Sequence, residues 1–128
     1  MRLLLDTSTF LWIIIDSPEL STRAREAFVD PENEVYLSSV SAWEIVVKYV
    51  LGRLPLPDSP ERFVPSQRDQ HGIKALPLDE DSALHLARLP MLHKDPFDRM
   101  LVCQAIVHGQ VILTPDSLVY QYPVRTLW

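Results

Sequence analysis

Four acidic residues that lie far apart in the chain each stand where an apolar run ends or a helical pattern begins: Asp6, Glu44, Asp98 and Asp116. If the apolar runs are parallel strands, the ends that precede Asp6 and Asp116 lie at one edge of the sheet, where open α/β folds build their sites. Carboxylates crowded together cannot all stay ionised unless a cation neutralises them. Oxygen-only ligands select hard ions such as Mg²⁺ or Mn²⁺, so the pattern predicts a divalent-metal site.

The first two acidic residues also have local explanations. Asp6 follows three leucines and precedes a Thr-Ser-Thr run, so it could cap the N-terminus of a helix. Glu44 follows Ser41 at the spacing of a capping box, and Lys48 one turn later offers it an ion pair. However, Glu44 shares its helical face with apolar residues such as Val47, where a carboxylate is costly without strong neutralisation.

The other two acids can be explained in the same way. Asp95 before Pro96 suits a helix N-cap, which puts Asp98 in the first turn, where the helix dipole favours negative charge. Asp116 could be a turn residue. Taken singly, each acid fits its local role. Because several acids from different elements are predicted at one edge of a sheet, a shared site explains the whole set better.

Apolar runs and turn residues predict strands that alternate with helices. Strands are expected at residues 2–5, 35–38, 73–78 and 111–114, with a short fifth strand at 124–127. Helices are expected at residues 7–15, 22–29 and 42–51, the last closed by Gly52, and from Asp79 to Pro90 and Asp95 to Gly109. In the proline-rich segment that follows helix 42–51, Pro60 could start a further helix that Pro65 kinks or ends. The alternation indicates a mostly parallel sheet covered on both faces.

Composition limits the class of protein. With 128 residues, of which 47% are hydrophobic and 23% charged, the chain is expected to form one domain, residues 1–128. No apolar run approaches the roughly 20 residues that cross a bilayer, and the first residues do not resemble a secretory signal, so a cytoplasmic protein is expected. The lone cysteine, Cys103, predicts a reduced, buried thiol.

The formal net charge of −5 argues against a protein that holds nucleic acid through bulk positive potential. A nuclease remains compatible with it, because divalent ions bound by the acidic residues would reverse the local potential where a phosphate approaches.

Four sequence blocks resemble those of the PIN-domain family, in order and over nearly the whole chain. They are Leu3-Leu4-Leu5-Asp6-Thr7-Ser8, Ser38-x-x-Ser41-x-Trp43-Glu44-Ile45, Asp95-Pro96-Phe97-Asp98-Arg99-Met100-Leu101 and Leu113-Thr114-x-Asp116. The resemblance is greatest to the VapC-type toxins of prokaryotic toxin–antitoxin pairs. It implies a three-layer α/β/α sandwich with a mostly parallel sheet of four or five strands.

The resemblance further implies an endoribonuclease that depends on Mg²⁺ or Mn²⁺ and acts as the toxin of such a pair. Its catalytic and metal-binding residues would be Asp6, Glu44, Asp98 and Asp116, and its supporting residues Ser8, Thr114, Asp95 and Arg99. Ser8 departs from the asparagine or histidine often found there. The implied partners are an RNA substrate, a cognate antitoxin and a second copy of the chain.

Other readings of the residues remain open. Arg99 could meet a phosphate or anchor neighbouring carboxylates, and His93 is expected to be a surface or structural residue. The apolar side of helix 42–51 is expected either to enter the core or to form a groove for an amphipathic helix of a partner. Alternatives for function are a PIN nuclease of RNA processing, a PIN-like scaffold that binds RNA without cutting it, and a receiver-like signalling domain that binds Mg²⁺.

Overall fold

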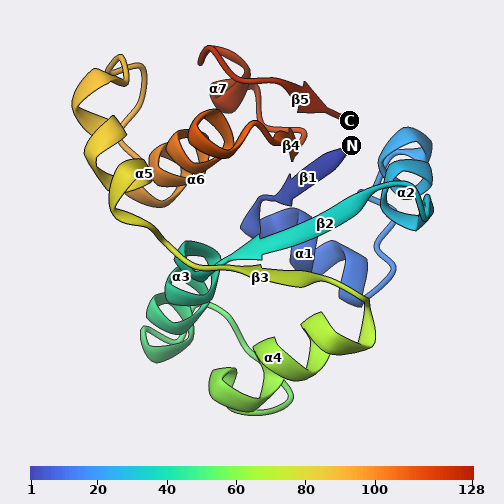
Figure 1. Ribbon diagram of the computed structural model, residues 1–128. Coiled ribbons are helices and arrows are strands. Elements are labelled where there is room, and N and C mark those ends of the chain that lie inside the picture. Colours follow the sequence, from blue (N-terminus) through green and yellow to red (C-terminus); the bar gives the residue numbers. More distant parts are fainter.

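One sheet of five parallel strands runs through the molecule, as described by a computed structural model of residues 1–128 (Figure 1). The strands are β1 (Arg2–Leu5), β2 (Glu34–Ser38), β3 (Lys74–Leu76), β4 (Val111–Leu113) and β5 (Thr126–Leu127). Every neighbouring pair is parallel. The predicted sheet is therefore confirmed in its five-stranded form, although its third and fifth strands are shorter than expected.

The strands follow the order β3-β2-β1-β4-β5 across the sheet. From β1 the chain first builds outward through β2 and β3, and then crosses back to place β4 on the other side of β1. Ligands of open α/β folds bind outside the carboxyl ends of the strands at such a reversal. Receiver-like domains have the order 2-1-3-4-5 instead, so the receiver-like alternative is wrong.

Helices cover both faces of the sheet (Figure 1). They are α1 (Thr7–Ile14), α2 (Thr22–Val29), α3 (Ser39–Val50), α4 (Pro60–Gln70), α5 (Glu80–His85), the 3₁₀ turn η1 (Leu86–Arg88), α6 (Pro96–His108) and α7 (Ser117–Tyr120). None of them has the length and apolarity needed to traverse a lipid bilayer. The two covered faces give the three layers of an α/β/α sandwich.

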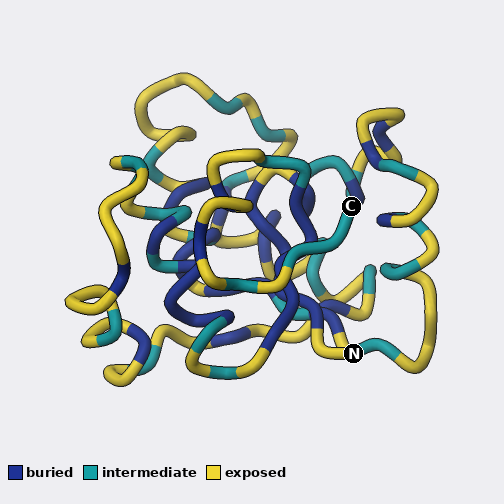
Figure 2. Tube along the Cα trace, turned by 90° about the horizontal axis from the view of Figure 1, so that it is seen from above, coloured by how far each residue is buried: buried dark blue, intermediate teal, exposed yellow.

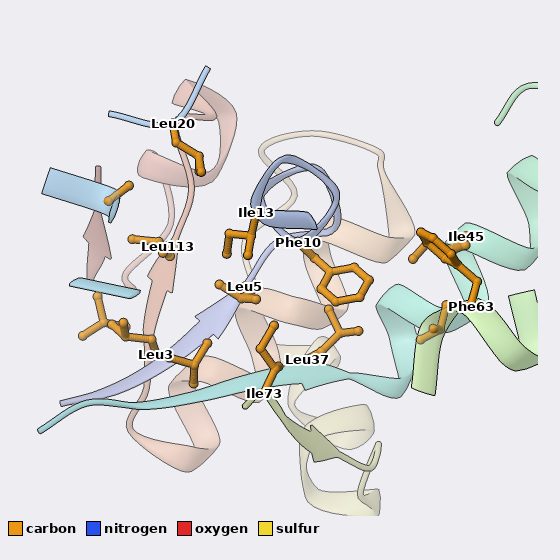
Figure 3. Packing of buried hydrophobic residues seen from close by; sticks show 14 residues of the cluster. Leu3, Leu5, Phe10, Ile13, Leu20, Leu37, Ile45, Phe63, Ile73 and Leu113 are labelled. Carbon is orange, nitrogen blue, oxygen red and sulfur yellow. The ribbon is translucent and has the colours of Figure 1, made fainter. Parts of the chain in front are cut away.

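The side chains of β1 alternate between two hydrophobic cores. Leu3 and Leu5 point to the core that includes Phe10 and Ile13 of α1 (Figure 3), whereas Leu4 belongs to the core beneath α6. Successive side chains of a strand point to opposite faces, so this central strand is buried on both sides. Figure 2 shows the buried trace in the middle of the molecule, surrounded by exposed turns.

Helix α3 begins earlier than its sequence pattern predicts. Ser38 is the N-cap, because its Oγ accepts a hydrogen bond from the Val40 backbone N at 3.0 Å. Ser41 and Glu44 therefore lie inside the helix, which starts about one turn before the predicted start. The predicted end is confirmed, since Gly52 has a positive φ of 71°, a conformation that glycine adopts at low cost.

Helix α4 continues through Pro65, which was expected to kink or end it. Pro65 lacks the N–H that would bond to the carbonyl of Glu61, but both residues are exposed, so water can satisfy that carbonyl. Phe63 and Val64 of the same helix are buried in the core, and their burial favours the helix. The one-turn helix α7, by contrast, was not predicted.

Candidate active site

The four acidic residues singled out in the sequence meet at one cavity of about 310 Å³. Asp6 follows β1, Glu44 lies in α3, Asp98 lies in the first turn of α6 and Asp116 follows β4. The same cavity is lined by Thr7, Ser8, Trp12, Lys48, Asp95 and Pro115. It lies at the carboxyl ends of β1 and β4, where the strand order reverses, so the placement of the four acids agrees with the prediction.

Asp6 caps helix α1 and also lines the cavity, as both of its explanations from the sequence predict. Its Oδ1 accepts a hydrogen bond from the Thr9 backbone N at 2.7 Å, and its Oδ2 accepts one from Thr114 Oγ1. Burial raises the pKa of Asp6, and the nearby charge of Asp116 adds to this effect, while the bonds from Thr114 and Thr9 oppose it. The carboxylate is thus fixed in orientation by two donors but remains expensive to ionise.

Thr114 connects the carboxyl ends of β1 and β4 at the cavity. Its fully buried hydroxyl donates to Asp6 and accepts a hydrogen bond from the Asp116 backbone N at 3.1 Å. Asp116 in turn caps α7, because its Oδ1 accepts from the Leu118 backbone N at 2.9 Å. Thr114 therefore occupies the supporting position that was expected of it, and Asp116 is a helix cap rather than only a turn residue.

Glu44 is buried and is bonded through both carboxylate oxygens. Thr7 Oγ1 donates to Oε1 at 2.6 Å, and Lys48 Nζ forms an ion pair with Oε2. Ser41 Oγ lies 3.0 Å from Thr7 Oγ1, so it can hold that hydroxyl in place. The capping-box explanation of Glu44 is wrong, because the helix starts one turn earlier. Thr7 was missed in the sequence, and only its position directly after Asp6 pointed to it.

Asp98, like Asp6, is costly to ionise. Burial is the main cause that raises its pKa to about 7, followed by the charge of Asp95, and Asp116 and Glu44 also contribute. Asp95 is the N-cap of α6, as expected, with its Oδ1 accepting from the backbone N of Phe97 at 2.9 Å and of Asp98 at 3.1 Å. Near neutral pH, Asp98 is therefore only partly ionised unless a cation neutralises it.

His93 was expected to be a surface or structural residue, but it contacts the acidic cavity. Its ring Nε2 lies 3.4 Å from Asp98 Oδ2, and its side chain is only 10% exposed. The hydrogen bond to His93 lowers the pKa of Asp98 and partly offsets the effect of burial. The only sequence signal for this contact was the position of His93 five residues before Asp98.

Arg99 and Ser8 complete the predicted set. Arg99 is buried, and its Nη1 donates to the carbonyl of Pro90 at 2.9 Å and to Tyr122 Oη at 3.1 Å. It therefore contacts neither a carboxylate nor the surface on which a phosphate would lie, and both expected roles are wrong. Ser8 is exposed and lines the cavity.

The donor set suits a hard divalent cation. Five carboxylates line the cavity and supply only oxygen ligands, with Lys48 as the one cation among them. As the side chains lie, no three acidic, histidine or cysteine groups are arranged to hold a metal ion. Carboxylates that repel one another need a cation to bring them together, so binding would require their side chains to turn toward the ion.

Comparison with known proteins places the chain in a family. The PIN domain model matches residues 3–124. A 56-residue segment, 44% of this chain, is 38% identical to Ribonuclease VapC16 of Mycobacterium tuberculosis, and spans 40% of that protein.

Two solved structures share the fold over almost their whole length. A chain of VapBC2 from Rickettsia felis, bound to a promoter DNA fragment, has a TM-score of 0.72 and 15% identity, with 98% of this chain and 97% of that one covered. A chain of DNA-bound VapBC from Salmonella typhimurium has a TM-score of 0.68 and 21% identity, with 98% and 96% covered. With a matching family model over nearly all of its residues and the fold of these relatives, the chain belongs to the PIN-domain family.

Proposed function

We propose that the protein is an endoribonuclease that depends on Mg²⁺ or Mn²⁺, hydrolyses RNA phosphodiester bonds and acts as the toxin of a toxin–antitoxin pair. The observation that carries this proposal is the convergence of acids from four separate chain segments on one cavity at the switch point of a parallel sheet. Membership of the PIN-domain family and the local identity to a protein named as a VapC ribonuclease support it. In this proposal, residues 1–128 act as one PIN domain.

The four acids would divide the work of holding the ion. Asp6 and Asp98 would hold the principal ion, and Glu44 and Asp116 would complete its shell, orient water or admit a second ion. A bound divalent ion acidifies water, neutralises phosphate charge and stabilises the leaving oxygen. Without it, the cavity would repel a phosphodiester, since five carboxylates face one lysine.

The neighbouring side chains keep these ligands in position. Thr9 and Thr114 hold Asp6, so this carboxylate loses little conformational freedom when it binds an ion. Glu44 is held by Thr7 through one carboxylate oxygen and by Lys48 through the other, so its orientation is also restricted before an ion binds. Asp98, with its raised pKa, must be deprotonated to bind, so ion binding would release protons near neutral pH.

The direct test is cleavage of total RNA by the purified chain with Mg²⁺, with Mn²⁺ and with a chelator. Cleavage should require a divalent ion and disappear in Asp6→Asn. The matched control is Asp81→Asn, which removes an exposed acid outside the cavity and should retain full cleavage. RNA degradation that persists in chelator, or in Asp6→Asn, would remove the acidic cavity from the reaction.

We further propose a cognate antitoxin and a second copy of the chain as partners. A largely apolar groove of about 540 Å³ between α3 and α4 supports the antitoxin proposal. Its lining residues are Ala42, Val46, Tyr49, Val50, Ser59, Pro60, Glu61, Val64 and Pro65. Apolar grooves of this kind accept the apolar face of an amphipathic helix.

Co-expression with the adjacent reading frame tests the partner. A stable complex that relieves toxicity is expected, and Val50→Asp should weaken it, since Val50 is 75% exposed in the groove. The matched control is Leu84→Asp, which changes an exposed leucine on α5. Metal-dependent RNA cleavage with no complex and no toxicity would instead favour a PIN nuclease of RNA processing.

A further inference from the structure

A row of polar side chains leads from the acidic cavity into the interior beside α6. Asp98 Oδ2 lies 3.4 Å from His93 Nε2, and His93 Nδ1 lies 2.7 Å from Tyr122 Oη. Tyr122 Oη also accepts a hydrogen bond from Arg99 Nη1 at 3.1 Å, and Arg99 Nη1 donates another to the carbonyl of Pro90. Tyr122 and Arg99 are both buried, so water does not compete for these bonds.

The hydrogen bonds of Tyr122 determine where its own proton goes. Its oxygen is approached by two N–H donors that cannot act as acceptors, the Arg99 guanidinium and the His93 backbone N, the latter at 3.2 Å. These two donors use both lone pairs of the phenol oxygen. The hydroxyl proton must therefore be donated elsewhere, and His93 Nδ1 is the acceptor at 2.7 Å.

The tautomer of His93 follows from this assignment. If Nδ1 accepts from Tyr122, it carries no proton, so the ring proton of the neutral imidazole is on Nε2. Nε2 is the nitrogen that lies 3.4 Å from Asp98 Oδ2. The packing of the His93 and Tyr122 rings, with centroids 5.4 Å apart, holds the imidazole in this orientation.

We propose that His93 is a positioning residue, which Arg99 and Tyr122 hold as the Nε2–H tautomer so that it donates to Asp98 and orients that carboxylate toward the divalent ion. The role of the ion rests on the proposed function, whereas the tautomer rests only on the hydrogen bonds. A donor on Oδ2 leaves the other oxygen of Asp98 free for the ion. Partners of this kind around a metal ligand typically change metal affinity by about 10–100-fold.

The tautomer can be measured directly on the full-length, metal-free protein. In a ¹⁵N NMR spectrum of the imidazole, Nδ1 of His93 should show the shift of an unprotonated nitrogen and Nε2 that of a protonated one. Tyr122→Phe keeps the ring but removes the hydroxyl, and it should convert His93 to a mixture of tautomers. A wild-type Nδ1–H tautomer would overturn the proposal.

Two variants of His93 separate its two contacts. The amide nitrogen of His93→Gln can occupy the position of Nε2 and still donate to Asp98, whereas the amide of His93→Asn reaches only the position of Nδ1. Titration calorimetry with Mg²⁺ should give about tenfold weaker binding for His93→Asn. It should give binding within about threefold of the wild type for His93→Gln. Thermal unfolding checks that both variants are folded.

His108→Asn is the matched control, because it removes a histidine whose aspartate partner, Asp79, lies outside the cavity. It should leave Mg²⁺ affinity unchanged. Equal affinities for His93→Asn, His93→Gln and the wild type would overturn the positioning role. A wild-type protein that binds Mg²⁺ in this pattern but leaves RNA intact would contradict the proposed function alone, so the two failures are distinguishable.

Discussion

Two aspartates of the molecule stand at helix N-termini beside a histidine, and yet their charges have opposite consequences. Asp79 caps α5 and lies 2.7 Å from His108 Nε2, and this bond is the largest cause that lowers its pKa. Asp98 lies in the first turn of α6, 3.4 Å from His93 Nε2, and its pKa is raised to about 7, chiefly by burial.

The difference comes from what surrounds each pair. Asp79 also accepts two hydrogen bonds from Ser82 and is partly exposed, so its negative charge is well satisfied. Asp98 is more buried and faces Asp95, Asp116 and Glu44. An aspartate at a helix N-terminus with a histidine partner is thus a stabilising arrangement when it stands alone. The same motif becomes a candidate ligand site when other carboxylates share its cavity.

The largest expected effect separates the two aspartates by activity. Asp98→Asn should lower the single-turnover rate of RNA cleavage at saturating Mg²⁺ by at least about 100-fold, because it removes a charged ligand. Asp79→Asn should cleave at the wild-type rate. Comparable losses in the two variants would mean that the contrast between the sites has no catalytic meaning.

Metal binding should also distinguish them by stability. At a Mg²⁺ concentration 100 times its dissociation constant, the free energy of unfolding of the wild type should rise by about 2.7 kcal/mol. Urea unfolding with and without Mg²⁺ measures this increase. Asp79→Asn should retain it and Asp98→Asn should lose most of it, and an undiminished gain in Asp98→Asn would place the ion elsewhere.

The pH dependence of stability should have opposite signs at the two sites. The pKa of Asp98 is raised from 3.8 to about 7, so between these pH values the folded protein holds a proton that the unfolded chain has lost. The contribution of Asp98 to the free energy of unfolding therefore falls as the pH rises from 3.8 to about 7. The pKa of Asp79 is lowered from 3.8, so its contribution is present above that value and is lost as pH falls below it.

Urea unfolding of the metal-free protein from pH 3 to pH 8 checks both signs. The free energy of unfolding of Asp98→Asn minus that of the wild type should be larger at pH 8 than at pH 5. Asp79→Asn should be less stable than the wild type at pH 7, and the difference should shrink as the pH falls toward 3. Parallel curves for all three proteins would contradict both assignments.

The smallest effect concerns the histidine that stabilises α5. His108→Ala removes one hydrogen bond to a partly exposed carboxylate, so the free energy of unfolding should fall by about 1 kcal/mol or less. Chemical denaturation measures this loss, and RNA cleavage should stay at the wild-type rate. A large fall in cleavage would mean that the Asp79–His108 pair communicates with the cavity.

Features encoded by local pattern could be predicted from the sequence. Helix α2 has the bounds expected from its residues, and Asp95 caps α6 as its place before Pro96 suggested. The meeting of Asp6 and Asp116 was also predictable, because both follow apolar runs and parallel strands bring such ends to one edge.

Contacts between distant segments were not predictable. Thr7 donates to Glu44 from 37 residues away, and His93 meets Tyr122 from 29 residues away. These contacts depend on how loops and helices pack, which no local pattern encodes. Arg99 was misjudged for the same reason, since its position in an acidic block suggested a charged partner, whereas folding buries it against Tyr122 and a backbone carbonyl.

The hydroxyl of Thr114 has a consequence for the protein during its synthesis. It bonds to Asp6 across a separation of 108 residues, and it holds the backbone of Asp116 at the same point. A nascent chain that has not yet delivered β4 to the growing sheet lacks this tie and one wall of the cavity. The cavity is therefore complete only after β4 has joined the sheet.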